Sequence, residues 1–353
     1  MNQQIRFCRS RDGTRIAYAL TGGGPPLVKA PHWLTHLEYE FRSPIWQPWI
    51  EALSRGQTLL RMDQRGCGLS DREIADLSFE ALVLDLEAAA DAAGFERFAL
   101  LGHSQGAAIA VEYAARHPGR VSHLVLLGGY ARGRLQRDPS PEARAEFAAQ
   151  LKLVELGWGR DDPAYRHMFS TQFAPGGSLE LINSMSELQR MSASPANAVR
   201  IMQAFLDIDV QAAAQRIACP ALLLHGRGDR RVPFEEGRRL AGLIPGARLV
   251  TLETENHILL EKEPAFARFF EELHAFVPRK APAAQAAFGQ LTAREREVLE
   301  LIAQGRDNAQ IAARLELSEK TVRNNITHIF DKLGVENRSQ AIVLARENGL
   351  GKG

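Results

Sequence analysis

The sequence predicts an α/β domain with a mostly parallel sheet covered on both faces, followed by a small all-α domain. Short apolar strands alternate with amphipathic helices over most of residues 1–277. A strand-free stretch at about 130–214 interrupts this alternation. An Ala- and Pro-rich linker is expected at 278–289, and a strand-free module of capped helices follows at 290–353.

Composition sets broad limits on function. The chain has 353 residues and a net charge of +1, so binding to nucleic acid would require a local basic patch. Its three cysteines, Cys8, Cys67 and Cys219, form no C-x-x-C pair, which favours a reducing compartment without a disulfide frame or metal site. We expect no metal and no cofactor. The start of the chain lacks the apolar segment of a secretory signal, and no apolar run approaches the ~20 residues that span a membrane. We therefore expect a cytoplasmic protein without a membrane partner.

The alternation of apolar strands and amphipathic helices predicts where each element of the first domain lies. Residues 4–20 predict an antiparallel hairpin that turns at Asp12-Gly13. The other strands are expected at 27–30, 58–62, 98–101, 123–127, 221–226 and 248–252, and the helices at 78–93, 107–116, 235–243 and 264–276.

The interrupting stretch predicts several amphipathic helices, with breaks at Pro139, Pro163, Pro175 and Pro195. We interpret it as a cap over the carboxyl edge of the sheet. The alternative is a helical bundle that only thickens the fold.

Ser104 lies in a Gly102-His103-Ser104-Gln105-Gly106 pattern between a predicted strand and a predicted helix. Small glycines allow strand and helix to approach closely, and the tight turn lifts the serine hydroxyl out of the sheet. The helix start also directs free backbone N–H groups toward a developing oxyanion.

Asp229 and His257 each follow a later predicted strand, giving the chain order Ser104, Asp229, His257. Serine becomes a good nucleophile when a neutral imidazole takes its proton and a carboxylate fixes the tautomer of that imidazole. The order and placement predict that the three side chains meet in space.

These motifs, with Asp63-Gln64-Arg65-Gly66-Cys67-Gly68-Leu69-Ser70 and His225-Gly226, resemble the α/β-hydrolase family over residues 1 to about 277. The resemblance implies that Ser104 is the nucleophile, Asp229 the acid and His257 the base. It also implies an oxyanion hole from the backbone N–H of Gln105 and a second donor, assigned to Trp33. Many members have His-Gly in the second loop where this chain has Pro31-His32, so the efficiency of turnover stays open.

A ligand pocket is expected to include His32, Trp33 and His103. His103 and His225 are expected to be packed rather than catalytic, and His32 and His36 line either the pocket or the loop surface. Cys67 has no base beside it in the sequence and is not expected to react.

The C-terminal module reads as a helix-turn-helix. Thr292 and Glu295 form a capping box, a short helix spans 308–315, and Ser318 caps a longer helix that reaches Leu333. On that longer helix, Val322, Ile326, Ile329 and Leu333 form an apolar stripe. The opposite face suits base edges, and its flanks suit phosphates. The expected base-edge residues are Lys320, Arg323, Asn324 and Thr327, and the flanking residues are Thr321, Asn325, His328 and Lys332.

Residues 291–346 resemble the LuxR-type DNA-binding domain through Leu291-Thr292, Lys320-Thr321-Val322 and Lys332-Leu333-Gly334-Val335. The resemblance implies binding to a double-stranded DNA operator as a homodimer, with the last helix, 338–348, as the dimer contact. The alternative is a solvated helical tail.

The sequence therefore favours a transcription regulator whose hydrolase-like domain binds, and in one version hydrolyses, a small carbonyl ligand. An ester, lactone, thioester or amide would fit. The alternatives are a serine hydrolase with an accessory DNA-binding domain and a non-catalytic ligand receptor.

Overall fold

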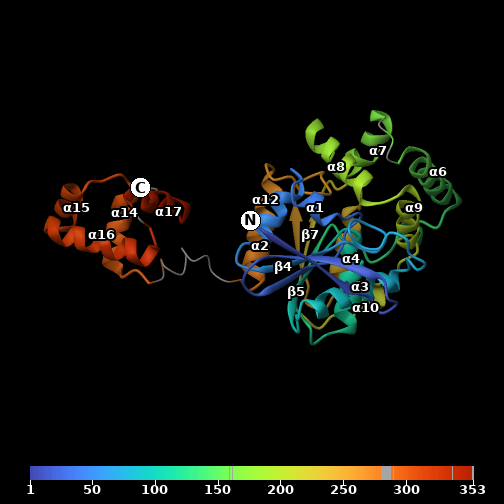
Figure 1. Ribbon diagram of the computed structural model, residues 1–353, viewed down its shortest axis with the longest axis horizontal. Helices are drawn as coiled ribbons and strands as arrows, with labels where there is room; N and C mark the ends of the chain where they lie inside the picture. Colours follow the sequence, from blue (N-terminus) through green and yellow to red (C-terminus); the bar gives the residue numbers. More distant parts are fainter. Residues whose placement is uncertain (159, 161, 280–287, 289, 336, 352–353) are drawn as a thin grey trace. The chain divides into compact units, whose positions relative to one another are not determined.

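The computed structural model describes residues 1–158, 160, 162–279, 288, 290–335 and 337–351 (Figure 1). The chain divides into two compact units, Met1–Arg279 and Lys280–Gly353. Each unit has its own hydrophobic core, as expected for independent domains.

An eight-stranded sheet forms the centre of the first unit, in the order β1-β2-β4-β3-β5-β6-β7-β8. β2 pairs antiparallel with β1 and β4, and all other neighbouring strands are parallel. The predicted hairpin and mostly parallel sheet are thus confirmed. The strands are β1 (Gln3–Arg9), β2 (Arg15–Gly22), β3 (Pro26–Lys29), β4 (Thr58–Met62), β5 (Phe98–His103), β6 (Val121–Leu127), β7 (Ala221–Gly226) and β8 (Arg248–Leu252).

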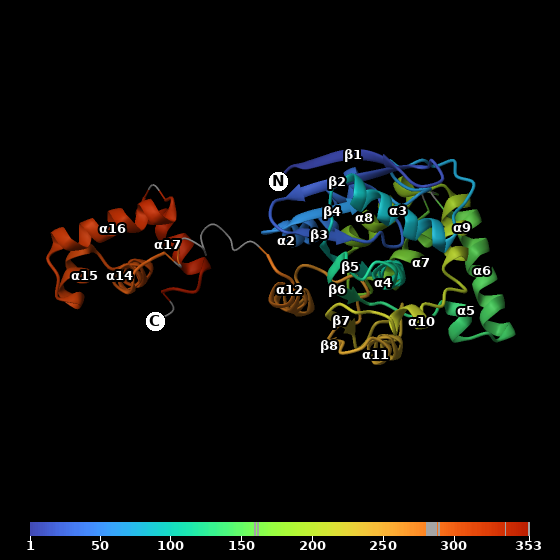
Figure 2. The same cartoon turned by 90° about the horizontal axis from the view of Figure 1, so that it is seen from below.

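Helices cover both faces of this sheet. Figure 2 shows α2 and α12 on one side, and α3, α4 and α10 on the other. Each side has a separate apolar cluster, because a buried parallel sheet must be covered on both faces. The covering helices are α2 (Trp46–Ser54), α3 (Phe79–Ala92), α4 (Gln105–Arg116), α10 (Gln211–Ala214), α11 (Phe234–Leu243) and α12 (Pro264–Phe276).

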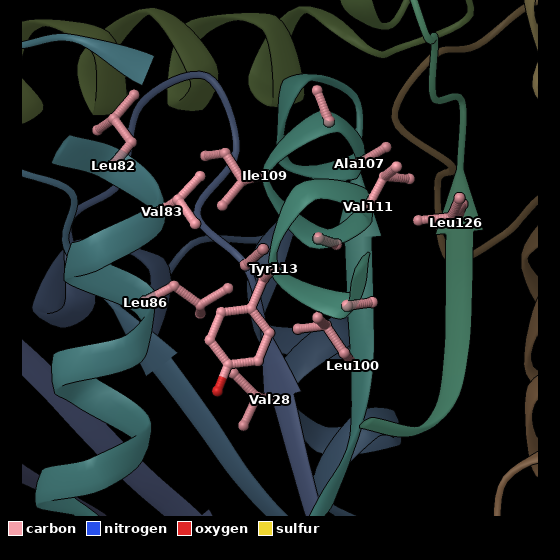
Figure 3. Packing of buried hydrophobic residues seen from close by; sticks show 14 of the residues in the cluster. Val28, Leu82, Val83, Leu86, Leu100, Ala107, Ile109, Val111, Tyr113 and Leu126 are labelled. Carbon is pink, nitrogen blue, oxygen red and sulfur yellow. The ribbon is translucent and has the colours of Figure 1, made fainter. Parts of the chain in front are cut away.

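The packing of α3 against α4 holds the helix that follows Ser104. Figure 3 shows Leu86 of α3 beside Tyr113 of α4, with Leu100 of β5 beneath α4. All three side chains are fully buried, and each large apolar side chain buried in this way contributes about 1.5–3 kcal/mol. α4 is therefore held against α3 and β5 by buried apolar side chains.

Two helices were missed by the sequence prediction, α1 (Leu37–Glu40) and α2. α1 is a single turn, capped by the His36 side chain, which accepts from the N–H of Tyr39. α2 has a readable pattern, since Trp46, Trp49 and Leu53 recur at helical spacing and are buried.

The predicted strand-free region forms a cap. Its helices are α5 (Arg134–Arg137), α6 (Pro141–Gly157), α7 (Pro163–Phe173), α8 (Leu179–Ser192) and α9 (Pro195–Ala204). The N–H groups of His257 and Ile258 both donate to the Phe173 carbonyl at 2.9 Å, and the Gly68 N–H donates to Ser192 O at 2.8 Å. Figure 1 shows α8 beyond the end toward which β7 points. The cap is thus bonded to loops that follow the carboxyl ends of β8 and β4, which favours the cap interpretation over a bundle.

The second unit is all-helical within its described residues, with α14 (Ala293–Ala303), α15 (Asn308–Leu315), α16 (Glu319–Leu333) and α17 (Arg338–Glu347). Thr292 and Glu295 form the predicted capping box. Phe288, predicted to lie in the linker, instead packs in the core of this unit at 8% exposure. Burying an aromatic side chain beside Leu291 is more favourable in free energy than leaving it in water. The folded domain therefore extends to Phe288.

Candidate functional site

Ser104 occupies a strained turn between β5 and α4. Its φ of 56° and ψ of −124° lie in a region that costs about 1–3 kcal/mol for a residue with a side chain. Its N–H donates to Leu127 O at 2.9 Å. A Cβ on Gly102 would lie 2.6 Å from the Ala107 Cα, so glycine is required where strand and helix meet. This geometry presents the hydroxyl at the carboxyl edge of the sheet.

Asp229 holds the imidazole of His257 by a short hydrogen bond. His257 Nδ1 donates to Asp229 Oδ2 at 2.6 Å. The other oxygen, Oδ1, accepts from the N–H groups of Arg231 at 2.8 Å and Val232 at 3.0 Å. Burial alone would raise the pKa of Asp229, but His257 and these donors outweigh it and lower that pKa. The carboxylate therefore stays charged and places the imidazole proton on Nδ1.

Ser104 and His257 line one narrow pocket beneath the cap, with a volume of about 20 Å³. Its walls are mainly apolar and include Trp46, Phe173 and Leu188. His257 Nε2 is buried without a hydrogen-bond partner among the described residues. The Nε2 lone pair is thus free to accept a proton inside the pocket that Ser104 lines.

The loop after β3 runs against the start of α4. A Cβ on Gly106 would lie 2.7 Å from Pro31 O, so the two backbones touch. The Trp33 carbonyl accepts from Gln64 Nε2 at 2.7 Å, which fixes the loop. Gln105 opens α4, and its N–H has no carbonyl one turn earlier in the helix. The loop that carries Trp33 therefore lies against the start of α4, and Trp33 and Ser104 line the same narrow pocket.

His32 lines the pocket rather than the loop surface, the two placements that the sequence left open. It lines the narrow pocket and is 3% exposed. Lys29 Nζ lies 3.4 Å from His32 Nδ1, and His32 Nε2 lies 3.9 Å from Glu40 Oε1. Burial and the nearby Lys29 charge lower the pKa of His32 well below its usual value. A neutral His32 thus accepts from Lys29 and turns its Nε2 proton toward Glu40.

Lys29 is a buried cation whose loss we expect to be stabilising. Burial lowers its pKa to about 8, opposed by Glu40 and aided by Arg61. Between pH 8 and about 10.4, the unfolded chain binds more protons at Lys29 than the folded chain does. The loss of folding stability that the buried charge causes therefore becomes smaller as the pH rises. Lys29→Met is expected to raise the melting temperature at pH 7, with a smaller gain at pH 10.

Differential scanning fluorimetry of the full chain measures this gain. Lys152→Met is the matched control, because it removes a lysine side chain that is 66% exposed. It should leave the melting temperature unchanged at both pH 7 and pH 10. A Lys29→Met gain of equal size at both pH values would contradict the assignment of Lys29 as a strained buried charge.

The other candidate histidines have packing roles. His103 lines the narrow pocket but donates from Nε2 to the His257 carbonyl at 3.1 Å, and it stacks on Trp49 with ring centroids 6.0 Å apart. His225 donates to Val232 O at 2.9 Å. Burial raises the pKa of the Cys67 thiol to about 12, so the thiol remains protonated at neutral pH.

Two residues of the site were missed by sequence reasoning. Gly128 has a φ of 56°, and a Cβ there would lie 3.0 Å from His257 Cε1. Phe173 lines the pocket and bonds the His257 backbone. Gly128 directly follows the strand beside Ser104, which is a readable signal. Phe173 has no such signal in the sequence, because its contacts with the site arise only when the cap packs over the elbow.

In the second unit, α16 presents a polar face. Its apolar stripe is buried through Val322 and Ile329 at 0% exposure and Leu333 at 8%. Lys320, Thr321, Arg323, Asn324, Thr327 and His328 are exposed. Glu316 has a left-handed φ of 53° and turns the chain between α15 and α16, whose N-cap is Ser318. This is the geometry of a helix-turn-helix.

Four of the predicted DNA contacts form hydrogen bonds within the unit itself. Thr321 Oγ1 lies 2.8 Å from Ser318 Oγ, and Thr327 Oγ1 donates to Arg323 O at 3.2 Å. Lys332 Nζ donates to both carboxylate oxygens of Glu295, at 2.6 and 2.8 Å. Half-buried Asn325 donates from Nδ2 to Thr321 O at 2.9 Å. The Lys332 and Asn325 side chains lie along the edge of the exposed face rather than free in solvent.

Fold and site together define a capped α/β domain with a serine elbow and an Asp–His pair, joined to a helix-turn-helix domain. The model of the alpha/beta hydrolase fold family matches residues 37–264, and that of the bacterial regulatory proteins, luxR family, matches residues 289–345. The chain belongs to the α/β-hydrolase family and carries a LuxR-type helix-turn-helix domain at residues 289–345.

Its relatives include hydrolases. The chain is 28% identical over 259 residues to the pyrrolizixenacetamide deacetylase of Xenorhabdus hominickii, covering 71% of this chain and 91% of that protein. It is 28% identical over 249 residues to the AB hydrolase superfamily protein YisY of Bacillus subtilis, covering 67% and 86%. An esterase structure from Exiguobacterium antarcticum matches with a TM-score of 0.65 and 25% identity, covering 77% of this chain and 99% of that chain.

Within the part of the chain that the structure describes, no helix is long and apolar enough to cross a bilayer. The same residues hold no group of three or more His, Cys, Asp or Glu side chains placed to bind a metal ion.

Proposed function

We propose that the chain is a cytoplasmic transcription regulator whose hydrolase domain binds a small carbonyl ligand at Ser104 and whose occupancy controls DNA binding by a homodimer. The observation that supports it best is a complete elbow and Asp–His pair beneath a cap, in the same chain as an exposed polar helix-turn-helix face. The ligand class is an ester, lactone, thioester or amide, since each offers a carbonyl to the oxyanion hole.

Ser104 acts as the nucleophile in this proposal. His257 Nε2 accepts the Ser104 proton as Oγ bonds to the carbonyl carbon, and Asp229 stabilises the imidazolium. The N–H groups of Gln105 and Trp33 receive the developing oxyanion. The bond from the carbonyl carbon to the leaving group then breaks as His257 gives that group the proton, and water releases the acyl group from Ser104.

On DNA, Arg323 and Asn324 read base edges, and Lys320, Thr321, Thr327 and His328 support them. Lys332 and Asn325 are left out of the primary contacts because both are half-buried at the edge of that face and their polar groups are bonded inside the unit. Val343 on α17 is 57% exposed, which suits an apolar dimer contact.

A screen of small esters, lactones, thioesters and amides with the full chain tests the proposal. Hydrolysis is followed by product release, and operator binding by the shift of a duplex selected from a random pool. A compound that requires an intact Ser104 for turnover and alters operator affinity supports the proposal. Turnover with no effect of any substrate on operator binding would instead indicate a hydrolase with an accessory DNA-binding domain.

A non-catalytic receptor is the second candidate. It is favoured by Pro31-His32 at the oxyanion loop. A ligand that shifts operator affinity without being consumed would establish that version.

A further inference from the structure

Ser104 also lines a second, much larger cavity of about 660 Å³ under the cap. Ser104, Trp33 and Phe173 line both spaces, so the nucleophile lies between the narrow apolar pocket and this larger cavity. The narrow pocket has room for about one or two water-sized groups. The bulk of a ligand must therefore occupy the larger cavity.

The larger cavity is rich in arginine. Five arginines line it, against three carboxylates, Asp138, Glu146 and Glu236. The five arginines are Arg132, Arg134, Arg137, Arg230 and Arg231.

Three of these arginines are paired. Arg132 contacts Glu236, Arg134 contacts Glu146 and Arg230 contacts Glu255, each at 2.7 Å. Their charges are neutralised within the protein, so they add little net attraction for an anion.

Arg137 and Arg231 differ from the other three. Neither forms an ion pair among the described residues. Arg137 lies over the Tyr130 ring at 5.4 Å, and its buried Nη1 has no hydrogen-bond partner in the same part of the chain. Arg231 lies over the Phe173 ring at 5.1 Å and makes one side-chain hydrogen bond, from Nη1 to Gln172 at 3.2 Å.

Burial lowers the pKa of both guanidinium groups, and the charges of Arg134 and Arg137 act on Arg231 in the same direction. Both nevertheless remain charged at neutral pH, because arginine does not lose its proton in proteins. The like charges of Arg137 and Arg231 repel each other, while Glu236 attracts Arg137 and Asp229 attracts Arg231 without forming an ion pair with it. A bound anion would offset the remaining repulsion.

We propose that Arg137 and Arg231 bind an anionic group of the ligand whose carbonyl is presented to Ser104. The guanidinium fork matches a carboxylate in geometry and charge. The substrate class is therefore a carboxylate-bearing ester or amide with a small acyl group in the narrow pocket. This inference rests on the proposed function of Ser104 and specifies its substrate.

The test compares 4-acetoxybenzoate with its neutral methyl ester. In each, Ser104 Oγ bonds to the acetyl carbon, the phenolic oxygen leaves with the proton held by His257, and water then releases acetate. The full chain is expected to show a kcat/KM at least tenfold higher for the anion. The double variant Arg137→Met, Arg231→Met should lose this preference, so that the ratio of its kcat/KM values for the two esters falls to about one.

Arg230→Met is the matched control, because it removes an arginine that lines the same cavity but is paired outward with Glu255. It should retain the preference for the anion. No preference in the parent chain, or a preference that survives in the double variant, would overturn the inference. In both cases turnover that depends on Ser104 would leave the proposed function standing.

A binding measurement keeps the test independent of turnover. Calorimetry with Ser104→Ala compares 4-acetamidobenzoate with its methyl ester. Tighter binding of the anion, lost in the variant that also carries both methionines, supports the subsite even where neither ester is cleaved. Equal affinity for the two compounds, or no binding of either, would overturn the subsite.

Discussion

Replacing Ser104 with alanine is expected to lower kcat/KM for p-nitrophenyl acetate by about 10³-fold or more, because the nucleophile of a triad acts as a unit with its base. The acetyl group is small enough for the narrow pocket of about 20 Å³. Alanine keeps the turn at the elbow, so the hydrolase domain should fold as before. Stopped-flow release of p-nitrophenolate measures the change.

Ser122→Ala provides the control for this substitution. Ser122 is partly buried on β6 and lines neither pocket beneath the cap. It should retain the parent rate. A Ser104→Ala protein that keeps its full rate would show that hydrolysis occurs elsewhere in the chain.

Replacing Arg323 or Asn324 with alanine is expected to weaken operator binding by about 1–3 kcal/mol each, or roughly 5- to 150-fold, and to relax specificity at one base position. Both side chains are exposed on α16, opposite the buried Val322 and Ile329, so their removal should not disturb the core. Fluorescence anisotropy with the selected operator and single-base variants of it measures both effects.

Arg296→Ala serves as the charge-matched control, because it removes an exposed arginine from α14 of the same unit. It should lower affinity less and leave the ranking of base variants unchanged. If both Arg323→Ala and Asn324→Ala preserve the parent footprint, α16 does not read the bases. Hydrolysis of p-nitrophenyl acetate by either variant should match that of the parent chain.

Most of the fold could be predicted because its signals are local. The alternation of strands and helices, the Asp12-Gly13 turn and the capping residues Ser78, Thr292 and Ser318 each act on neighbouring residues. α1 was missed since one helical turn has no periodicity, and its support comes from the distant carboxylate of Asp63.

The pairing of Asp229 with His257 could also be predicted, because each residue follows a strand and the ends of these strands meet. In the structure His257 Nδ1 lies 2.6 Å from Asp229 Oδ2. What the sequence could not reveal depends on contacts across the cap. Arg137 and Phe173 carry no motif, and their importance appears only when α5 and α7 cover the elbow. The ion pair of Lys332 with Glu295 was hidden for the same reason, since the two residues are far apart in the chain.

The central claim is that a carbonyl-binding pocket controls a DNA-binding helix. Its most direct test is to measure the operator Kd of the full chain before and after modification by a small alkyl fluorophosphonate. The Ser104 oxygen bonds to phosphorus, and fluoride leaves. We predict one equivalent of label, located on Ser104, and a change in operator Kd of at least about fivefold, equivalent to a coupling of ~1 kcal/mol. Complete labelling of Ser104 with an unchanged operator Kd would contradict the account.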